Sequence, residues 1–217
     1  MAVPDVSSRV VDGPASRDDH DAVVGGPIGI GAAVTPGTDT LVQCPECGYG
    51  AAQLRPGAAA IACRSFGRRW RELFDGATER EEDGRAVLRR RAPGGWSAIE
   101  RCEHVTAVLD RTAGHLLLIR TRAAPSLDEF AAGSSDEVPW PEDDPEAPLA
   151  AIAEAGERAA EQMDLLRLED WNRVGSLAGV SASAFSVVRS AVHEAVHHLR
   201  LAGDDLAAAS VPPADDD

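Results

Sequence analysis

Two histidines near the C-terminal end of the sequence are the residues best placed to do chemistry. His193 and His197 belong to the stretch His193-Glu-Ala-Val-His197. In a helix, side chains four residues apart project from one face, one turn apart, so both imidazoles can reach a single metal ion. Val192 and Val196 precede them, which places the imidazoles at the border of the apolar face. The pair therefore predicts a metal site that needs a further ligand from elsewhere in the fold.

The candidates for that further ligand are the other histidines. His198 lies about 140° around the helix from His193 and is a poor partner for it. His20 lies in a polar N-terminal segment. His104 and His115 share one face of a predicted helix but are separated by roughly 16 Å along its axis, so only one of them can join the pair. Spacing alone leaves this choice open.

The same stretch also matches H-E-x-x-H, the zinc-peptidase pattern in which Glu194 would be the general base. That function needs another ligand after the motif. No Glu and no His follows His198, and Arg200 stands where the extended peptidase pattern has glycine. A zinc protease is therefore an alternative with little support beyond the motif itself.

A second group of potential ligands is Cys44-Pro-Glu-Cys47, which has the shape of a zinc knuckle. A tight turn there would direct two sulfurs at one ion, although two cysteines are only half of a structural zinc site. Cys63 and Cys102 are single residues within predicted helices, where core packing is the ordinary interpretation. We therefore interpret Cys44 and Cys47 as a possible second metal or redox site.

Helical periodicity predicts the elements that must position these residues. Apolar residues recur every three or four positions over about 56–74, 97–116, 148–168 and 183–201. Ser97 and Glu100 form the pattern of a capping box at the start of the second helix. Alternating β-type runs are almost absent, so we expect an all-α fold, a four-helix bundle over residues 44–203. Residues 1–43 are expected to be a disordered tail and residues 204–217 a short acidic tail.

Charge and composition exclude several functions. The formal net charge is −15, but residues 1–43, 125–148 and 203–217 together carry more negative charge than the whole chain, so the remaining body is nearly neutral. A nucleic-acid-binding protein needs a basic face, and none is indicated. The sequence has no apolar run long enough to span a membrane and no signal-peptide pattern, and its few cysteines fit a reducing compartment. We therefore expect a cytoplasmic protein.

Three motifs resemble those of DinB-like proteins, over about residues 44–201. They are Trp96-Ser97-x-x-Glu100 followed by His104, the pair His193 and His197, and the turn around Trp171. The leader Cys44-Pro-Glu-Cys47-Gly is similar to that of actinobacterial members of the mycothiol-dependent maleylpyruvate isomerase-like group. The resemblance implies that His104, His193 and His197 bind one divalent ion, with zinc first and nickel or iron as alternatives. Glu194 is then expected just beside the ligand face.

The resemblance also implies a reaction. In the better-understood branch of the family, an open coordination position takes the thiolate of mycothiol or bacillithiol, and the metal lowers the thiol pKa. The chain is thus expected to be a metal-dependent thiol S-transferase or isomerase whose partners are a small-molecule thiol and an electrophilic substrate, with a homodimer as a further expectation. The alternative is a bundle that binds metal without catalysing a reaction.

Overall fold

The computed structural model describes residues 43–79, 84–91, 95–130 and 145–209, all within one unit of the chain. Its long elements are four helices: α1 (Pro56–Thr78), α3 (Ala98–Thr121), α4 (Glu146–Asp164) and α5 (Ala184–Ala209). A four-residue helix, α2 (Gly84–Val87), lies between α1 and α3. The predicted all-α fold, a four-helix bundle, is confirmed.

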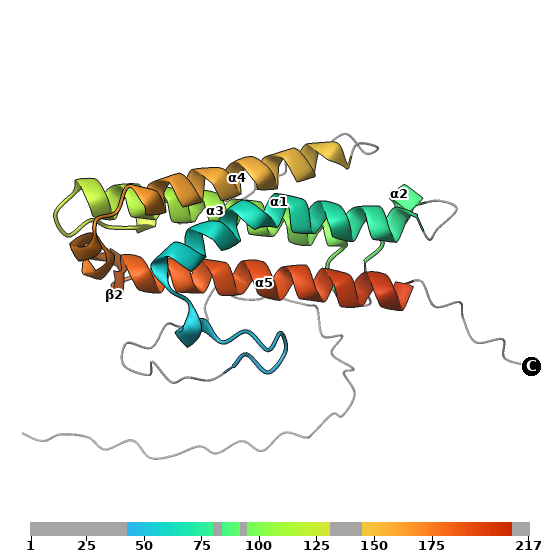
Figure 1. The fold of residues 1–217 in the computed structure, drawn as a ribbon, viewed down its shortest axis with the longest axis horizontal. Coiled ribbons are helices and arrows are strands. Elements are labelled where there is room, and N and C mark those ends of the chain that lie inside the picture. Colours follow the sequence, from blue (N-terminus) through green and yellow to red (C-terminus); the bar gives the residue numbers. More distant parts are fainter. Residues whose placement is uncertain (1–42, 80–83, 92–94, 131–144, 210–217) are drawn as a thin grey trace, which may run out of the picture. The chain divides into compact units, whose positions relative to one another are not determined.

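The helices pack in a ring in which α1 and α3 each contact both α4 and α5. Figure 1 shows that α3 and α4 run in the same direction, and that α1 and α5 run in the opposite one. Two consecutive parallel helices require the chain to return along the bundle between them. The fold is therefore a bundle with a long crossover connection, unlike one joined only by short turns.

Aromatic residues of α1 fill the centre of the bundle. Phe66, Trp70 and Phe74 recur every four residues and are fully buried, with Trp70 and Phe74 edge to face at 5.7 Å. Helix α4 approaches α1 closely at Gly156, where an added Cβ would lie 2.4 Å from the carbonyl oxygen of Cys63. Not every apolar residue of α1 faces the core, because the side chain of Ile61 is 70% exposed.

The start of α3 is fixed by the predicted capping box, which is confirmed. The Glu100 amide donates to the Ser97 hydroxyl at 3.2 Å, and the Ser97 amide donates to the Glu100 carboxylate at 2.8 Å. Both hydrogen bonds satisfy amides that a helix N-terminus otherwise leaves unpaired. They set the position of His104, which follows about one turn further along the same helix.

Helix α5 is longer than the sequence pattern indicated. It continues through Gly203 to Ala209, with Ala202 and Leu206 buried, so residues 204–209 of the predicted acidic tail are helical. Residues 1–42 and 210–217, which make up almost all the rest of the two predicted tails, lie outside the described residues.

A β-hairpin that the sequence pattern did not indicate precedes α5. Strands β1 (Val174–Leu177) and β2 (Val180–Ser183) are antiparallel and joined by Ala178 and Gly179, whose φ angles are +49° and +77°. Positive φ at both turn residues is the geometry of a two-residue hairpin turn that matches the twist of its strands. Three short 3₁₀ segments complete the described elements: Ala51–Gln53, Asp128–Phe130 and Leu168–Asn172.

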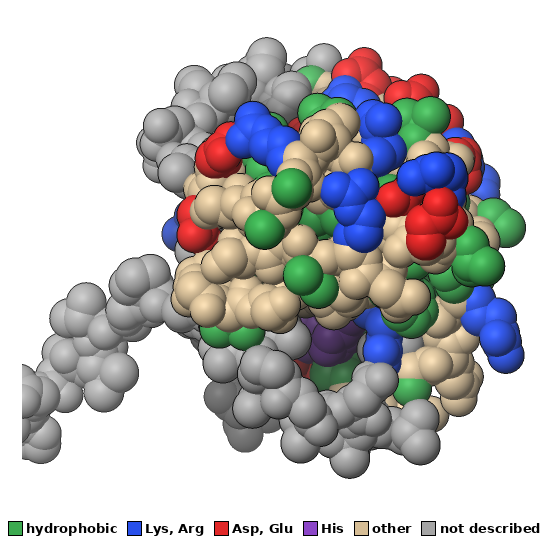
Figure 2. Space-filling view, turned by 90° about the vertical axis from the view of Figure 1, so that its left-hand side faces the viewer, with side chains coloured by type: hydrophobic (Ala, Val, Ile, Leu, Met, Phe, Trp, Pro, Cys, Tyr) green, Lys and Arg blue, Asp and Glu red, His purple; other side chains and the backbone are tan. Residues whose placement is uncertain are grey.

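The described surface gives two further observations. On the end of the molecule shown in Figure 2, arginine and acidic side chains are interspersed, and histidine surface is visible within a recess in the lower part of the view. No helix among the described residues combines the length and the apolar character needed to cross a membrane.

Candidate metal centres

Helix α5 carries two interleaved pairs of potential metal ligands. His193 and His197 are four residues apart, and so are Glu194 and His198. The second pair is displaced from the first by one residue, which turns it by about 100° around the helix axis. The first pair is grouped with side chains from the segment before α1, and the second with a side chain of α3.

The first group, the cysteine–histidine cluster, consists of Cys44, Cys47, His193 and His197. One donor atom from each residue lies within 4.8 Å of the donor atoms of the other three. The Cys44 sulfur is 3.9 Å from Nδ1 of His197, and both cysteines are free thiols. Two thiolates and two imidazoles are a donor set of structural zinc sites.

A tight turn brings the two sulfurs of this cluster to one side. The Gly48 amide donates to the Cys44 carbonyl at 2.7 Å, and the Cys44 amide donates to the Tyr49 carbonyl at 3.0 Å. Gly48 has a φ of +68°, which glycine adopts without steric cost. The ring of Tyr49, the next residue in the sequence, stacks on the His193 ring, with the ring centroids 5.7 Å apart and an angle of 8° between the ring planes. The turn therefore docks against α5 at the histidine pair.

The ring nitrogens of the two histidines in the cluster have different surroundings. Nε2 of His193 is buried and has no hydrogen-bond partner within the described part of the chain. His197 directs Nδ1 toward Cys44, while its Nε2 lies 3.3 Å from the Glu46 carboxylate. Metal-bound histidines commonly hydrogen-bond a carboxylate through the other nitrogen. A metal ion at Nδ1 of His197 would complete an arrangement of this kind.

Electrostatics at the two sulfurs differ. Burial raises the pKa of the Cys44 thiol, but hydrogen bonds from the Cys47 and Glu46 amides outweigh burial and leave its pKa below the ordinary value. For Cys47, burial is the largest effect and its pKa is raised. Burial also lowers the pKa of His193, which keeps that imidazole neutral and able to bind metal.

The second group, the histidine–glutamate cluster, consists of His104, Glu194 and His198. Their donor atoms also lie within 4.8 Å of one another. A Glu194 carboxylate oxygen is 3.9 Å from Nε2 of His104 and 3.4 Å from Nε2 of His198. Two imidazoles and one carboxylate are a donor set that catalytic zinc and non-haem iron accept, with coordination positions left open.

Aromatic and charged neighbours hold this cluster in place. The Trp96 ring stacks on His198 at 5.5 Å and meets His104 edge-on at 5.1 Å. Arg101 lies 3.4 Å from Nδ1 of His198 and forms an ion pair with Asp205 at 2.8 Å. The cluster is therefore framed by residues of α3, α5 and the segment just before α3.

Charge and burial in the histidine–glutamate cluster favour an ionised Glu194 carboxylate and a neutral His198 ring. The imidazoles of His104 and then His198 hold the pKa of Glu194 well below its usual range. Burial lowers the pKa of His198 despite the nearby carboxylate. Neutral imidazole and ionised carboxylate are the protonation states in which these groups bind divalent ions.

The structure divides the three histidines that the family resemblance placed on one ion. His193 and His197 lie with the two cysteines, whereas His104 lies with Glu194 and His198. Glu194 is closer to a ligand position than expected. The angular position of His198 on the helix makes it a poor partner for His193. The sequence signal that could have identified His198 as a potential ligand is its four-residue spacing from Glu194. The predicted triad itself stays a prediction.

His115 belongs to neither cluster. It is buried in the bundle, its ring lies 6.5 Å edge-on from Phe130, and burial lowers its pKa. His104 and His115 are too far apart along the helix axis for both to join one site. The position of His115 outside both clusters is consistent with that separation.

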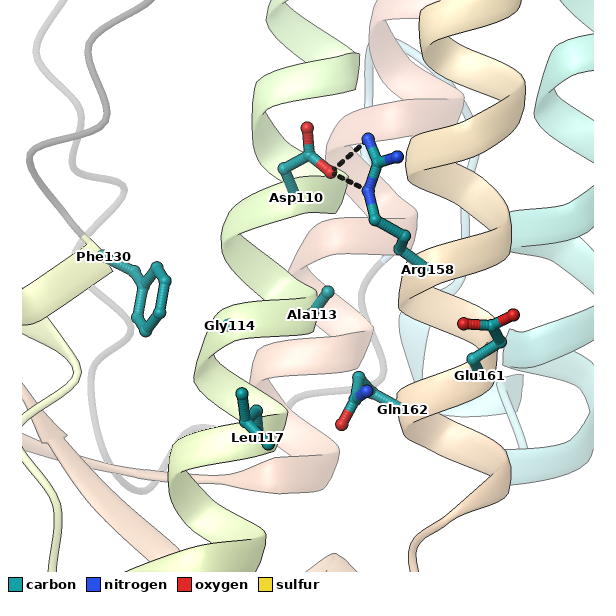
Figure 3. A pocket seen from close by; sticks show the side chains of 8 residues that line it. All are labelled: Asp110, Ala113, Gly114, Leu117, Phe130, Arg158, Glu161 and Gln162. Atoms are coloured by element: carbon teal, nitrogen blue, oxygen red, sulfur yellow. Dashed lines mark hydrogen bonds and ion pairs between the residues drawn. The ribbon is translucent and has the colours of Figure 1, made fainter.

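A pocket of about 340 Å³ opens elsewhere, between α3 and α4. Figure 3 shows the Asp110–Arg158 ion pair on one side of it and Phe130 on another. None of its lining residues is a member of either cluster: Asp110, Ala113, Gly114, Leu117, Phe130, Arg158, Glu161 and Gln162. Its lining also lacks histidine and cysteine, so the potential metal ligands of the two clusters lie outside this pocket.

Comparison with known proteins supports this fold and family. The model of the DinB superfamily matches residues 65–202. The chain belongs to the DinB superfamily. A solved structure similar to this DinB protein is YfiT from Bacillus subtilis, described as a "probable metal-dependent hydrolase with an unusual four-helix bundle topology". The two share 13% sequence identity with a TM-score of 0.57, over 72% of this chain and 89% of YfiT. No curated protein matches the sequence.

Proposed function

We propose that this DinB-superfamily protein is a metal-dependent enzyme whose reaction centre is the histidine–glutamate cluster. Its reaction would be transfer of a low-molecular-weight thiol such as mycothiol to an electrophilic substrate, or isomerisation through a thiol adduct. The observation that carries the proposal is the convergence of His104, Glu194 and His198 on one point, because three donors leave coordination positions open for a reactant.

The donor count separates the two clusters as reaction centres. The cysteine–histidine cluster offers four donors, which complete a tetrahedral zinc site. The histidine–glutamate cluster offers three donors with a single negative charge, so a divalent ion there would keep net positive charge for an incoming thiolate. When bound, such an ion supplies Lewis acidity and lowers the pKa of a thiol.

The protein's own residues would orient this centre. Trp96 covers one face of His198 and the edge of His104, which restricts both rings. The ion pair between Arg101 and Asp205 fixes the guanidinium beside His198. In the reaction the thiol would give its proton to water and its sulfur would bond to the electrophilic carbon. In transfer, the leaving group of that carbon, such as halide, would depart with its electron pair. In isomerisation, the electron pair of the attacked double bond would move onto the neighbouring atoms, and would return after bond rotation to expel the thiolate.

Hydrolysis is a second candidate, favoured by the description of YfiT as a probable metal-dependent hydrolase. The same centre would then use water in place of a thiol. The peptidase alternative has less support, because the Glu194 carboxylate lies with His104 and His198 while His193 and His197 lie with the cysteines.

The proposal is tested with purified protein loaded separately with zinc, nickel and iron. Electrophilic substrates, such as maleylpyruvate-type and haloaromatic compounds, are incubated with and without mycothiol, and product is quantified. We expect turnover that requires the thiol and is lost in His104→Ala and Glu194→Gln, with His115→Gln as the matched control.

Each outcome decides between the candidate functions. Turnover without thiol would favour the hydrolase. Casein cleavage abolished by Glu194→Gln would favour the peptidase. Stoichiometric metal at the cluster with no turnover under any condition would favour a non-enzymatic metal-binding bundle and overturn the enzyme proposal.

A further inference from the structure

The cysteine–histidine cluster lies outside the proposed reaction centre and joins two distant parts of the chain. Its sulfurs precede α1 and its imidazoles are on α5, so that Cys44 and His197 are 153 residues apart in sequence. Direct contacts of this segment with α5 include Tyr49 on His193 and a 3.5 Å hydrogen bond from Arg200 to the Cys47 carbonyl. Side chains of α5 at and beside the cluster therefore take part in the attachment of this segment.

The geometry of the cluster matches zinc more closely than a redox disulfide. Zinc bonds of ~2.3 Å to sulfur and ~2.0 Å to nitrogen, arranged tetrahedrally, separate ligand atoms by roughly 3.3–3.8 Å. The donors here already lie within 4.8 Å of each other. A disulfide between Cys44 and Cys47 would use only the sulfurs and would not involve the two imidazoles that lie with them.

The surroundings of the cluster also fit a metal site. The Gly48 amide donates to the Cys44 carbonyl and the Cys44 amide donates to the Tyr49 carbonyl, which holds the turn that carries both sulfurs. The Glu46 carboxylate faces Nε2 of His197, whose other ring nitrogen is directed toward Cys44. Two thiolates balance the charge of one divalent ion, so a site that is partly buried need not hold net charge. These contacts orient the ligands before any ion binds.

We infer that Cys44, Cys47, His193 and His197 bind one zinc ion in a closed tetrahedral site that fastens residues 43–55 to α5. This site is separate from the histidine–glutamate cluster and has a structural role. Because the His197 and His198 rings are 5.5 Å apart, the same zinc site also steadies the part of α5 that presents Glu194 and His198.

Cobalt substitution tests the assignment without relying on activity. Full-length protein is freed of metal under reducing conditions and titrated with Co²⁺, and thiolate-to-cobalt charge-transfer absorption is recorded. We expect this absorption in wild type, its loss in Cys44→Ser/Cys47→Ser and its reduction in His193→Ala. Cys102→Ser is the matched control, since Cys102 is a buried thiol in neither cluster. Circular dichroism verifies that each variant is folded.

A second measurement uses only wild-type protein, in case the variants fail to fold. A mercurial reagent that blocks thiolates should release about one equivalent of zinc per chain, detected with a colorimetric chelator. Absence of charge-transfer absorption in folded wild type, or zinc binding unchanged in Cys44→Ser/Cys47→Ser, would overturn the inference.

The His104→Ala variant distinguishes the proposed zinc site from the proposed reaction centre. This variant should keep the charge-transfer absorption while losing metal from the histidine–glutamate cluster. Failure of the enzyme proposal therefore leaves this zinc site standing, and the reverse also holds.

Discussion

The two clusters on α5 each contain a pair of residues four positions apart, but they differ in the number and type of their potential metal ligands. The cysteine–histidine cluster adds two sulfurs from a local turn to a histidine pair and reaches four donors, so a tetrahedral ion bound there would have no open position. The histidine–glutamate cluster adds one imidazole from α3 to a Glu–His pair and stops at three. The two pairs are rotated from each other by about 100° around the axis of α5. This rotation is enough to separate a site suited to a structural role from a site suited to a reaction.

Replacing His198 should have the largest effect on turnover, and it tests most directly whether the two clusters have separate roles. We expect His198→Ala to reduce thiol-dependent turnover by at least about 100-fold, because the centre loses one of three donors. Steady-state kinetics on metal-loaded protein measure this. Cobalt charge-transfer absorption, recorded in parallel, should be unchanged. If turnover survives in His198→Ala but disappears in His193→Ala, the originally predicted triad is the better description.

Metal removal should have the second largest effect. It should distinguish the two clusters by how much a bound ion at each contributes to the thermal stability of the protein. A ligand at about 100 times its dissociation constant stabilises the folded state by about 2.7 kcal/mol, which corresponds to about 5–10 °C in Tm for a chain of this size. We expect a chelator to lower the Tm of wild type by this amount and to change that of Cys44→Ser/Cys47→Ser much less. Thermal unfolding by circular dichroism measures both. Equal shifts in the two proteins would assign the stabilising ion to the other cluster.

Replacing Glu46 should have a smaller effect, confined to one cluster. Glu46→Gln weakens the interaction with Nε2 of His197, and such carboxylates contribute up to 10–100-fold in metal affinity. Since Glu46 is 67% exposed, solvent screening puts the expected loss at the lower end, about tenfold or less. Competition with a zinc indicator measures it. An equal loss from the histidine–glutamate cluster would mean that the two sites are not independent.

Removing the cap of α3 should have the smallest effect. Ser97→Ala deletes the hydroxyl that accepts the Glu100 amide, which costs about 1 kcal/mol in folding free energy. Urea unfolding measures this loss. Any loss of metal affinity should appear at the cluster that includes His104 and leave cobalt charge-transfer absorption intact. A stability change below a few tenths of a kcal/mol would contradict the role of the cap.

Local features were predictable because they depend on neighbours in sequence. The capping box at Ser97 and the placement of His193 and His197 on one face of α5 follow from helix geometry alone. The hairpin of β1 and β2 was missed because a turn at Ala178, a non-glycine residue with positive φ, leaves little trace in the sequence. The sequence does not reveal that Ile61 is exposed, because a helical pattern identifies apolar positions but not which of them a partner helix covers.

The sequence by itself determined the four helices, the knuckle-like turn at Cys44 and the four-residue spacing of the ligand pairs, since each is set within a few residues. Only the tertiary structure decided which donors complete each pair. The resemblance grouped His104 with His193 and His197, but packing places α3 beside Glu194 and His198 and the cysteine turn beside His193 and His197. Ligands drawn from segments 90 or more residues apart are brought together by helix packing, which no local pattern encodes.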